Sequence, residues 1–216
     1  MLAQRKTKYD GPPVADSGDI ARPVLSEEDR LRGATYRLLA TLLSVPPSKP
    51  MLSQIASLVG NETPYGQALE ALSKAAIDTS DGVVELEFHA LFIGMGEGEL
   101  TPYGSYYLTG FLHERPLARL RTDMRALGIA RADGVSEPED GMSGLCEIMA
   151  GLIEGDFGSA QPIEEQRRFF EAHLAPWAGR FFSDLEFADS AVFYRPVGAL
   201  GRAFIDIEVK AFSITN

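Results

Sequence analysis

Apolar residues recur every three or four positions along most of this 216-residue chain, and almost no segment alternates between apolar and polar residues. A period near 3.6 residues places apolar side chains on one face of an α-helix. Prolines and glycines such as Pro46–Pro47 and Gly128 end these runs, as they do at helix termini. The sequence therefore predicts an all-α fold in which residues 24–216 form a single-domain helical bundle.

The periodicity also sets the expected helix boundaries. The predicted helices cover residues 26–45, 51–59, 64–77, 84–92, 116–127, 142–153, 162–174, 177–185 and 197–211. Ser26, followed by three acidic residues, is typical of a capped helix N-terminus. Residues 101–107 lack periodicity and are expected to be irregular. The last range also suits a strand, because Ile205, Ile207 and Val209 alternate with polar residues.

Residues 1–23 are predicted to be a flexible N-terminal arm. Arg5, Lys6 and Lys8 lie near its start, but no apolar run follows them, so the arm does not resemble a secretory signal. No stretch approaches the roughly 18 consecutive apolar residues of a membrane-spanning helix. Cys146 is the single cysteine, which excludes an intrachain disulfide and is compatible with a reducing compartment. These features predict a cytoplasmic protein without an integral membrane segment.

The charge balance limits the classes of partner. Acidic residues outnumber basic residues, 31 to 20, and the formal net charge is −11. Nucleic acids and anionic membrane surfaces attract the opposite charge, so neither is an expected partner. The same negative charge favours a basic peptide.

Side chains that carry most catalytic and metal chemistry are scattered. The three histidines lie in different segments without metal-ligand spacing: His89, His113 and His173. The glycines of residues 94–98 neither follow a strand nor open a helix, so they predict a bend rather than a phosphate-binding loop. Asp123 and the acids of residues 137–140 would suit paired-carboxylate catalysis, but acids at a helix start also explain the run. We expect no enzymatic activity, no metal and no cofactor.

Aromatic residues are unusually dense around a glycine- and proline-rich segment. They are Phe88, Phe92, Tyr103, Tyr106, Tyr107 and Phe111. Aromatic side chains on loops often line a groove for an apolar ligand, because they offer a large contact area at a small entropic cost. They would equally fill the core beneath a long connection. Composition alone leaves both interpretations open.

Four motifs in a fixed order resemble the TorD/DmsD/NarJ family of redox-enzyme maturation chaperones. Phe88–Gly94 is similar to the family's aromatic helix end, and Thr101–Tyr107 contains its P-[YW]-x-S-x-[YW] loop. Glu137–Asp140 resembles its E-P-x-D-H motif, except that Gly141 stands in place of the histidine. Phe169–Trp177 matches its F-x-x-x-H-L-x-P-W segment. The likeness extends over residues 26–212.

The resemblance implies a TorD-like chaperone without turnover of its own. Such a protein binds the twin-arginine signal peptide, or the apo form, of a molybdenum or tungsten oxidoreductase subunit and assists cofactor insertion before export. The acidic run is then expected to pair with the arginines, while aromatic and apolar residues receive the hydrophobic part of the peptide. The implied signal-peptide-binding residues are Phe88, Leu91, Phe92, Tyr103, Ser105, Tyr106, Glu137, Pro138, Glu139 and Asp140.

Two alternative functions stay open. GTP binding has been attributed to the family, and the glycine-rich residues 94–98 would suit a nucleotide, although the chain has no Walker loop. The other alternative is a helical interaction protein that ignores twin-arginine peptides. A bundle with long connections is also compatible with a domain-swapped homodimer.

Overall fold

The computed structural model describes residues 25–94, 98–130 and 137–214. In these ranges the regular secondary structure is helical, and no strand forms beyond an isolated bridge between Tyr103 and Gly141. The all-α prediction is confirmed. The expected flexible arm, residues 1–23, lies outside the described residues. None of the described helices is both long enough and apolar enough to cross a bilayer.

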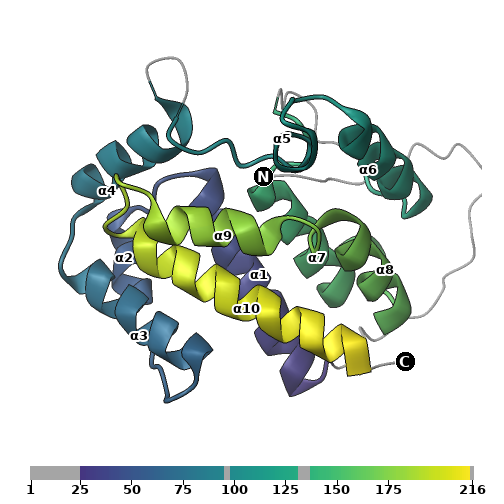
Figure 1. Ribbon diagram of the computed structural model, residues 1–216. Helices are drawn as coiled ribbons and strands as arrows, with labels where there is room; N and C mark the ends of the chain where they lie inside the picture. The colour runs from purple at the N-terminus through teal and green to yellow at the C-terminus, as the bar shows by residue number, and fades with distance from the viewer. Residues whose placement is uncertain (1–24, 95–97, 131–136, 215–216) are drawn as a thin grey trace, which may run out of the picture.

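The helices follow the predicted order, with boundaries shifted by a few residues (Figure 1). Residues 205–209 lie inside the last helix, so they do not form the strand that their alternation also allowed. The helices are α1 (Glu27–Ser44), α2 (Lys49–Ile55), α3 (Pro64–Ile77), α4 (Asp81–Phe88), the π-helical turn η1 (His89–Ile93), α5 (Gly104–Thr109), α6 (Arg115–Ala126), α7 (Met142–Glu154), α8 (Ile163–His173), α9 (Ala178–Phe187) and α10 (Tyr194–Ile214).

The short helix α5 occupies a segment that the sequence predicted to be irregular. A helix of six residues is too short to show periodicity. Its first turn is capped by a distant side chain, because the Asp140 carboxylate accepts a hydrogen bond from the Ser105 N–H at 2.6 Å. Gly110 ends the helix in the left-handed conformation, with φ of 82°, which glycine adopts without steric cost. Tertiary contacts therefore form a helix that the local sequence does not predict.

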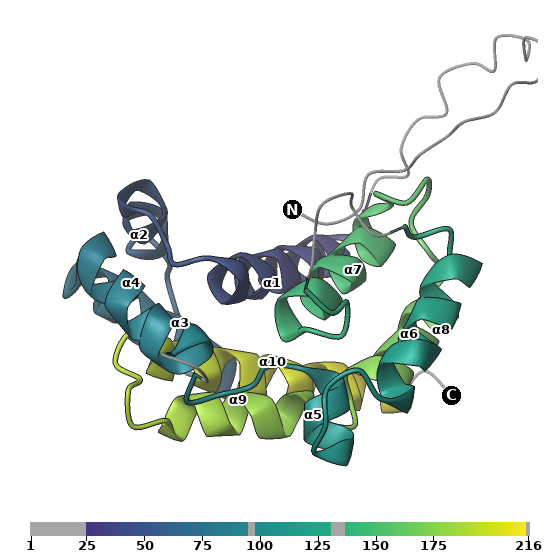
Figure 2. The same ribbon diagram turned by 90° about the horizontal axis from the view of Figure 1, so that it is seen from above.

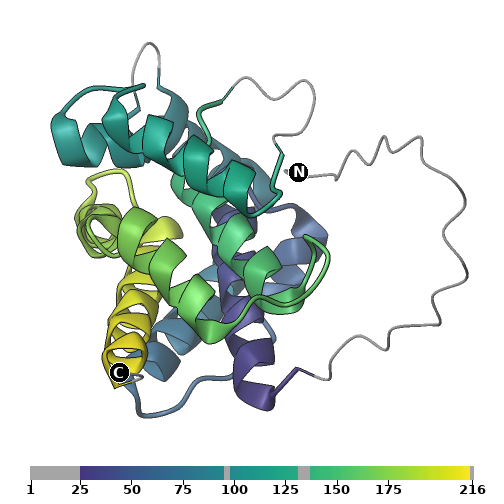
Figure 3. The same ribbon diagram turned by 90° about the vertical axis from the view of Figure 1, so that its right-hand side faces the viewer.

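Two helix pairs form the body of the molecule. α1 packs along α7, and α9 packs along α10, as seen from two directions in Figures 1 and 2. α3 lies against α10 with α2 beside it, and α8 contacts both α6 and α7. α5 and α6 contact each other and lie above α9 and α10 in the view of Figure 3.

A buried polar cluster joins α1 to α10. The Arg32 guanidinium donates two hydrogen bonds to the Glu208 carboxylate, of 2.7 and 3.0 Å. The Tyr36 hydroxyl donates a third, of 2.9 Å, and Arg32 also donates to Gln166 of α8. Glu208 is fully buried. Burial, and then the negative charge of Glu208, raises the pKa of Tyr36, so this hydroxyl stays protonated and remains a donor.

The opposite ends of the same two helices are also connected. The Tyr194 hydroxyl at the start of α10 donates to the Leu42 carbonyl near the end of α1, at 2.9 Å. The Glu87 carboxylate of α4 accepts hydrogen bonds of 2.7 to 3.0 Å from the N–H groups of Val192, Phe193 and Tyr194. This carboxylate satisfies donors that the start of α10 would otherwise leave unpaired. α1, α4 and α10 are thereby fixed relative to one another.

Arg32→Ala should lower the free energy of unfolding by about 3 to 5 kcal/mol, because it leaves the Glu208 charge buried without its cation. The matched control is Arg202→Ala, since the Arg202 side chain is 44% exposed where it pairs with Glu186. That control should cost about 1 kcal/mol or less. Urea unfolding followed by circular dichroism measures the free energy of unfolding of both variants. Equal losses of unfolding free energy in the two variants would contradict the expectation that the buried pair of Arg32 contributes more to stability than the exposed pair of Arg202.

Candidate functional site

Two of the four sequence motifs lie side by side. The segment Pro102–Gly104 pairs with the segment Asp140–Met142 through two main-chain hydrogen bonds of 2.9 Å each. Their central residues, Tyr103 and Gly141, form an antiparallel bridge. The Asp140 carboxylate, which caps α5, strengthens the pairing with a third hydrogen bond. The loop before α5 and the loop before α7 are thus one structural unit, called here the paired loops.

The indole of Trp177 supports the paired loops. A Cβ atom on Gly104 would lie 3.0 Å from Trp177 Nε1, so the absence of a side chain lets the loop lie against the indole without displacing it. Trp177 Nε1 donates to the His173 carbonyl at 2.7 Å, and the indole packs on the Tyr107 ring at 5.2 Å between centroids. Burial lowers the pKa of His173 although Asp123 Oδ2, 2.8 Å from His173 Nε2, acts to raise it. The fourth sequence motif therefore has a structural role beneath the second.

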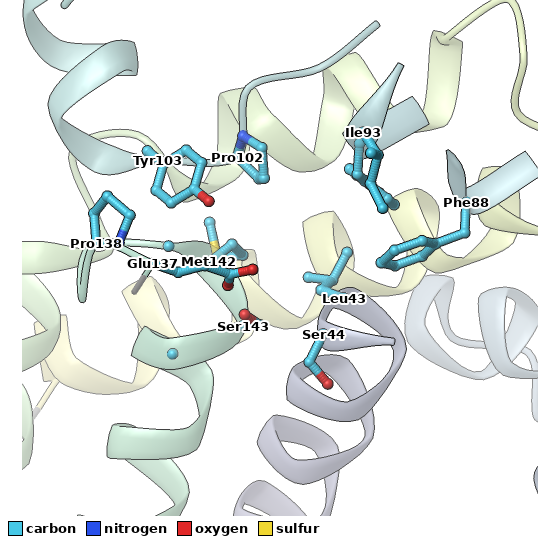
Figure 4. Close-up of a pocket in the computed structure, with 13 residues that line it drawn as sticks. Leu43, Ser44, Phe88, Ile93, Pro102, Tyr103, Glu137, Pro138, Met142 and Ser143 are labelled. Atoms are coloured by element: carbon cyan, nitrogen blue, oxygen red, sulfur yellow. The ribbon is translucent and has the colours of Figure 1, made fainter. Parts of the chain in front are cut away.

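A groove opens beside the paired loops (Figure 4). It is formed by the end of α1, by α4 and η1, by the paired loops and by the first turn of α7. It encloses about 120 Å³, which is below the roughly 300 to 1,000 Å³ of a drug-sized pocket. The lining residues are Leu43, Ser44, Phe88, Phe92, Ile93, Pro102, Tyr103, Glu137, Pro138, Gly141, Met142, Ser143 and Gly144.

The two ends of this groove differ in chemistry. Glu137 and Tyr103 form an acidic end, and Leu43, Phe88 and Ile93 form an apolar end on the other side of the opening (Figure 4). Burial, and then the charges of Glu137 and Asp140, raises the pKa of Tyr103. The Tyr103 hydroxyl is therefore a hydrogen-bond donor at neutral pH. The groove suits a ligand that is basic at one end and apolar at the other.

The three acidic residues of the run, Glu137, Glu139 and Asp140, lie in three different environments. Glu137 is exposed and lines the groove. Glu139 is buried, and its carboxylate accepts hydrogen bonds from Arg121 Nε and Nη2 at 3.0 and 2.8 Å. Asp140 is buried and caps α5 through the Ser105 N–H. Of the three acids expected to meet the arginines, only Glu137 lines the groove.

The apolar and aromatic residues that were expected to contact the peptide also lie in different surroundings. Leu91 is fully buried in the core and does not line the groove, so its expected place in a ligand-facing cluster is wrong. Phe88 is buried as well, although it contributes to the groove wall, and Phe92 packs against the Tyr194 ring. The core interpretation therefore applies to Leu91, while Phe88 and Phe92 line the groove wall. Whether the groove residues bind a signal peptide stays a prediction.

Tyr106 and Ser105 lie away from the groove. Tyr106 is 44% exposed and faces a second hollow that Arg180 and Asp184 also line. Ser105 is fully buried on α5. The backbone between Tyr103 and Tyr106 turns into α5, which points their side chains in different directions. The sequence predicted an irregular segment here and did not anticipate this divergence.

Sequence reasoning missed the contribution of α1 to the groove. Leu43 and Ser44 end the first helix, far from every recognised motif. The available signal was Pro46–Pro47, which stops the helix where its last apolar residue reaches the groove. In the described ranges, no group of three or more histidine, cysteine, aspartate or glutamate side chains is arranged to hold a metal ion.

The chain is similar to known proteins in both sequence and fold. The sequence model of the nitrate reductase delta subunit family matches residues 60–183, which include both paired loops and Trp177. Two Vibrio cholerae proteins named chaperone protein TorD, from strains O395 and N16961, are each 25% identical over 190 residues, or 84% of this chain and 81% of theirs. The crystal structure of a proposed redox enzyme maturation protein from Archaeoglobus fulgidus matches with a TM-score of 0.54 at 18% identity, covering 82% of this chain and 94% of that chain. This last likeness concerns the fold alone.

Phe88→Ala should destabilise the protein by about 3 to 5 kcal/mol, because it empties a site packed against Phe92 and Tyr194. Tyr106→Ala truncates an aromatic ring that is 44% exposed, and it should cost about 1 kcal/mol or less. Chemical denaturation of both variants tests whether Phe88 is packed in the groove wall while Tyr106 lies at the surface. A loss at Tyr106 as large as that at Phe88 would contradict it.

Proposed function

We propose that this chain, which belongs to the nitrate reductase delta subunit family, is a maturation chaperone that binds the twin-arginine signal peptide of a molybdenum or tungsten oxidoreductase subunit. The chain is a chaperone rather than an enzyme, in line with the TorD chaperones to which it is similar. One observation carries the signal-peptide proposal: a single groove has an acidic end and an apolar end.

The order of chemical groups along the groove matches the order in such a peptide. A twin-arginine signal has a basic segment followed by an apolar segment. Arginines at the acidic end would pair with the Glu137 carboxylate and stack on the Tyr103 ring. The apolar segment would then bury its side chains against Leu43, Phe88 and Ile93. A peptide lying along the groove would contact both ends.

Electrostatics favour the same direction of binding. Glu137 supplies an exposed negative charge at the acidic end. Asp140 lies near it, 3% exposed, and its Oδ1 has no hydrogen-bond partner among the described residues. A charge in a region of low dielectric acts more strongly on a nearby cation than one in water. Because Glu137 lines the groove and Asp140 lies beside it, we assign the attraction to these two acids.

We assign two kinds of role to the residues that the sequence singled out. Tyr103, Glu137, Pro138, Phe88 and Phe92 line the groove and would contact the peptide. The others hold the groove in shape or lie beside it: Leu91, Ser105, Tyr106, Glu139 and Asp140.

Nucleotide binding has less support. Gly94 ends η1 with φ of 61°, and a Cβ atom on Gly98 would lie 2.6 Å from the Phe92 carbonyl carbon. Backbone geometry therefore explains both of these glycines without a phosphate ligand.

The proposed client is the catalytic subunit of the oxidoreductase, met in the cytoplasm before export. Signal-peptide binding would keep the subunit from export until its cofactor is inserted. A domain-swapped homodimer remains compatible with this role, since the groove is formed by segments from both halves of the chain.

A synthetic peptide with two adjacent arginines followed by a run of leucine and alanine should bind the protein, and added salt should weaken binding because exposed charge pairs are screened over about 8 to 10 Å. Glu137→Gln should cost about 0.5 to 1 kcal/mol of binding energy. The control Glu28→Gln removes the same charge at the far end of α1, about 24 Å from Ser44 along the helix. Isothermal titration calorimetry measures the affinity of the parent protein and of both variants for the peptide.

Equal losses in the two variants would indicate a general effect of net charge rather than contact at Glu137. A parent protein that does not bind the peptide would refute the proposed function.

A further inference from the structure

α4 and η1 carry apolar residues on two faces. The inner face packs into the core through Val84, Phe88 and Leu91, which are buried. A second set of apolar residues, separated by three or four positions, is exposed to solvent: Val83, Leu86, Ala90 and Ile93. Such spacings place side chains on one side of a helix. These four exposed residues therefore form a row, called here the outer stripe.

The outer stripe begins in the groove. Ile93 lines the groove and is the last residue of η1. From there the stripe follows α4, which extends from η1 toward the side of the molecule away from α5 and α7 (Figure 1). Val83, at the far end of the stripe, lines a second hollow with apolar residues of α3 and of the segment that enters α10: Ala71, Ala75, Val192, Phe193 and Pro196. The stripe thus connects the groove to another apolar depression, about 15 Å away along the helix.

The apolar segment of a signal peptide is longer than the apolar end of the groove. Such a segment contains roughly 7 to 15 residues, so it measures about 10 to 22 Å as a helix and more when it is extended. Phe88 and Ile93, which form the groove wall on this side, lie only about 7 Å apart along the axis of their helix. A segment that enters from the acidic end therefore extends beyond Ile93.

The charges beside the outer stripe favour a peptide over a second copy of this chain. Residues 81–93 contain three acidic residues, Asp81, Glu85 and Glu87, and no lysine or arginine. Two copies that paired through the stripe would bring these acids close to one another, and like charges across an interface are unfavourable. An apolar segment that follows two arginines meets no such repulsion.

We propose that the outer stripe is an interaction surface for the far half of the apolar segment of the bound signal peptide, the part that extends beyond the groove. This inference rests on the proposed function and extends the binding site along α4. The first apolar residues of the peptide would contact Leu43 and Phe88, and the following ones would cover Ala90 and Leu86. Removing exposed apolar surface from water stabilises the complex. The length of the apolar segment therefore contributes to affinity.

The test compares two peptides that share the two arginines. They differ in the number of leucine and alanine residues that follow, about five in one peptide and about twelve in the other. The parent protein should bind the long peptide about tenfold more tightly, because only the long peptide reaches Leu86 and Val83. Isothermal titration calorimetry measures both affinities.

Leu86→Gln in the full chain separates the stripe from the groove. Leu86 is 73% exposed and does not line the groove, so the melting temperature should stay within a few degrees of the parent value. The variant should bind the long peptide about fivefold more weakly and the short peptide unchanged. Leu31→Gln is the matched control, because Leu31 is 64% exposed near the start of α1, about 20 Å from Ser44 along that helix. It should leave both affinities unchanged.

Equal affinities of the parent for the two peptides would overturn the inference and leave the proposed function intact. Equal losses with both peptides in Leu86→Gln would also overturn it, since the substitution would then disturb the groove in general. The same holds if Leu31→Gln weakens binding of the long peptide as much as Leu86→Gln does.

Sedimentation of the parent and of Leu86→Gln tests the other occupant. A parent dimer that becomes a monomer in the variant would show that the stripe joins two copies of the chain, and would overturn the inference. If Leu86→Gln does not fold, Val83→Thr at the other end of the stripe gives the same comparison. A parent that binds neither peptide would refute the proposed function and this inference with it.

Discussion

The buried ion pair between Arg32 and Glu208 fixes the first helix to the last, and the position of the groove depends on that alignment. The pair lies near the start of α1 and the end of α10, while Tyr194 and Leu42 connect the other ends of the same helices. The two helices therefore run antiparallel and are held at both ends. Because α1 ends at Leu43 and Ser44, its alignment with α10 brings these residues to the groove. A contact far from the site thus sets the geometry of one of its walls.

Carboxylates acting on main-chain N–H groups fix the remaining walls. Glu87 holds α4 against the start of α10, and Glu99 accepts hydrogen bonds from the N–H groups of Asp189 and Ser190 in the preceding loop. Asp140 does the same for α5. Each of these acids supplies hydrogen bonds that a helix start or a loop would otherwise lack. Part of the strongly acidic composition therefore serves to join segments rather than to attract a partner.

Most of the helices could be predicted from the sequence because one face of each is buried, and burial of one face gives the apolar residues a period of three to four positions. α5 could not be predicted, because its cap comes from Asp140 on another loop. The motifs identified the paired loops, but they could not distinguish the three acids of the run. Arg121 reaches Glu139 from α6, while the main chain of Ser105 meets Asp140. Which acid remains at the surface depends on these partners, and they are fixed only when α5, α6 and α7 pack together.

The pairing between Pro102–Gly104 and Asp140–Met142 uses main-chain atoms for both of its 2.9 Å hydrogen bonds. Bonds of this kind do not depend on which side chains the two loops carry, provided that the glycine beneath the indole is kept. The frame of the groove can therefore persist while the residues that line it change. During evolution, a duplicated copy of such a gene would acquire a new client through a few substitutions in the lining, without having to find a new fold.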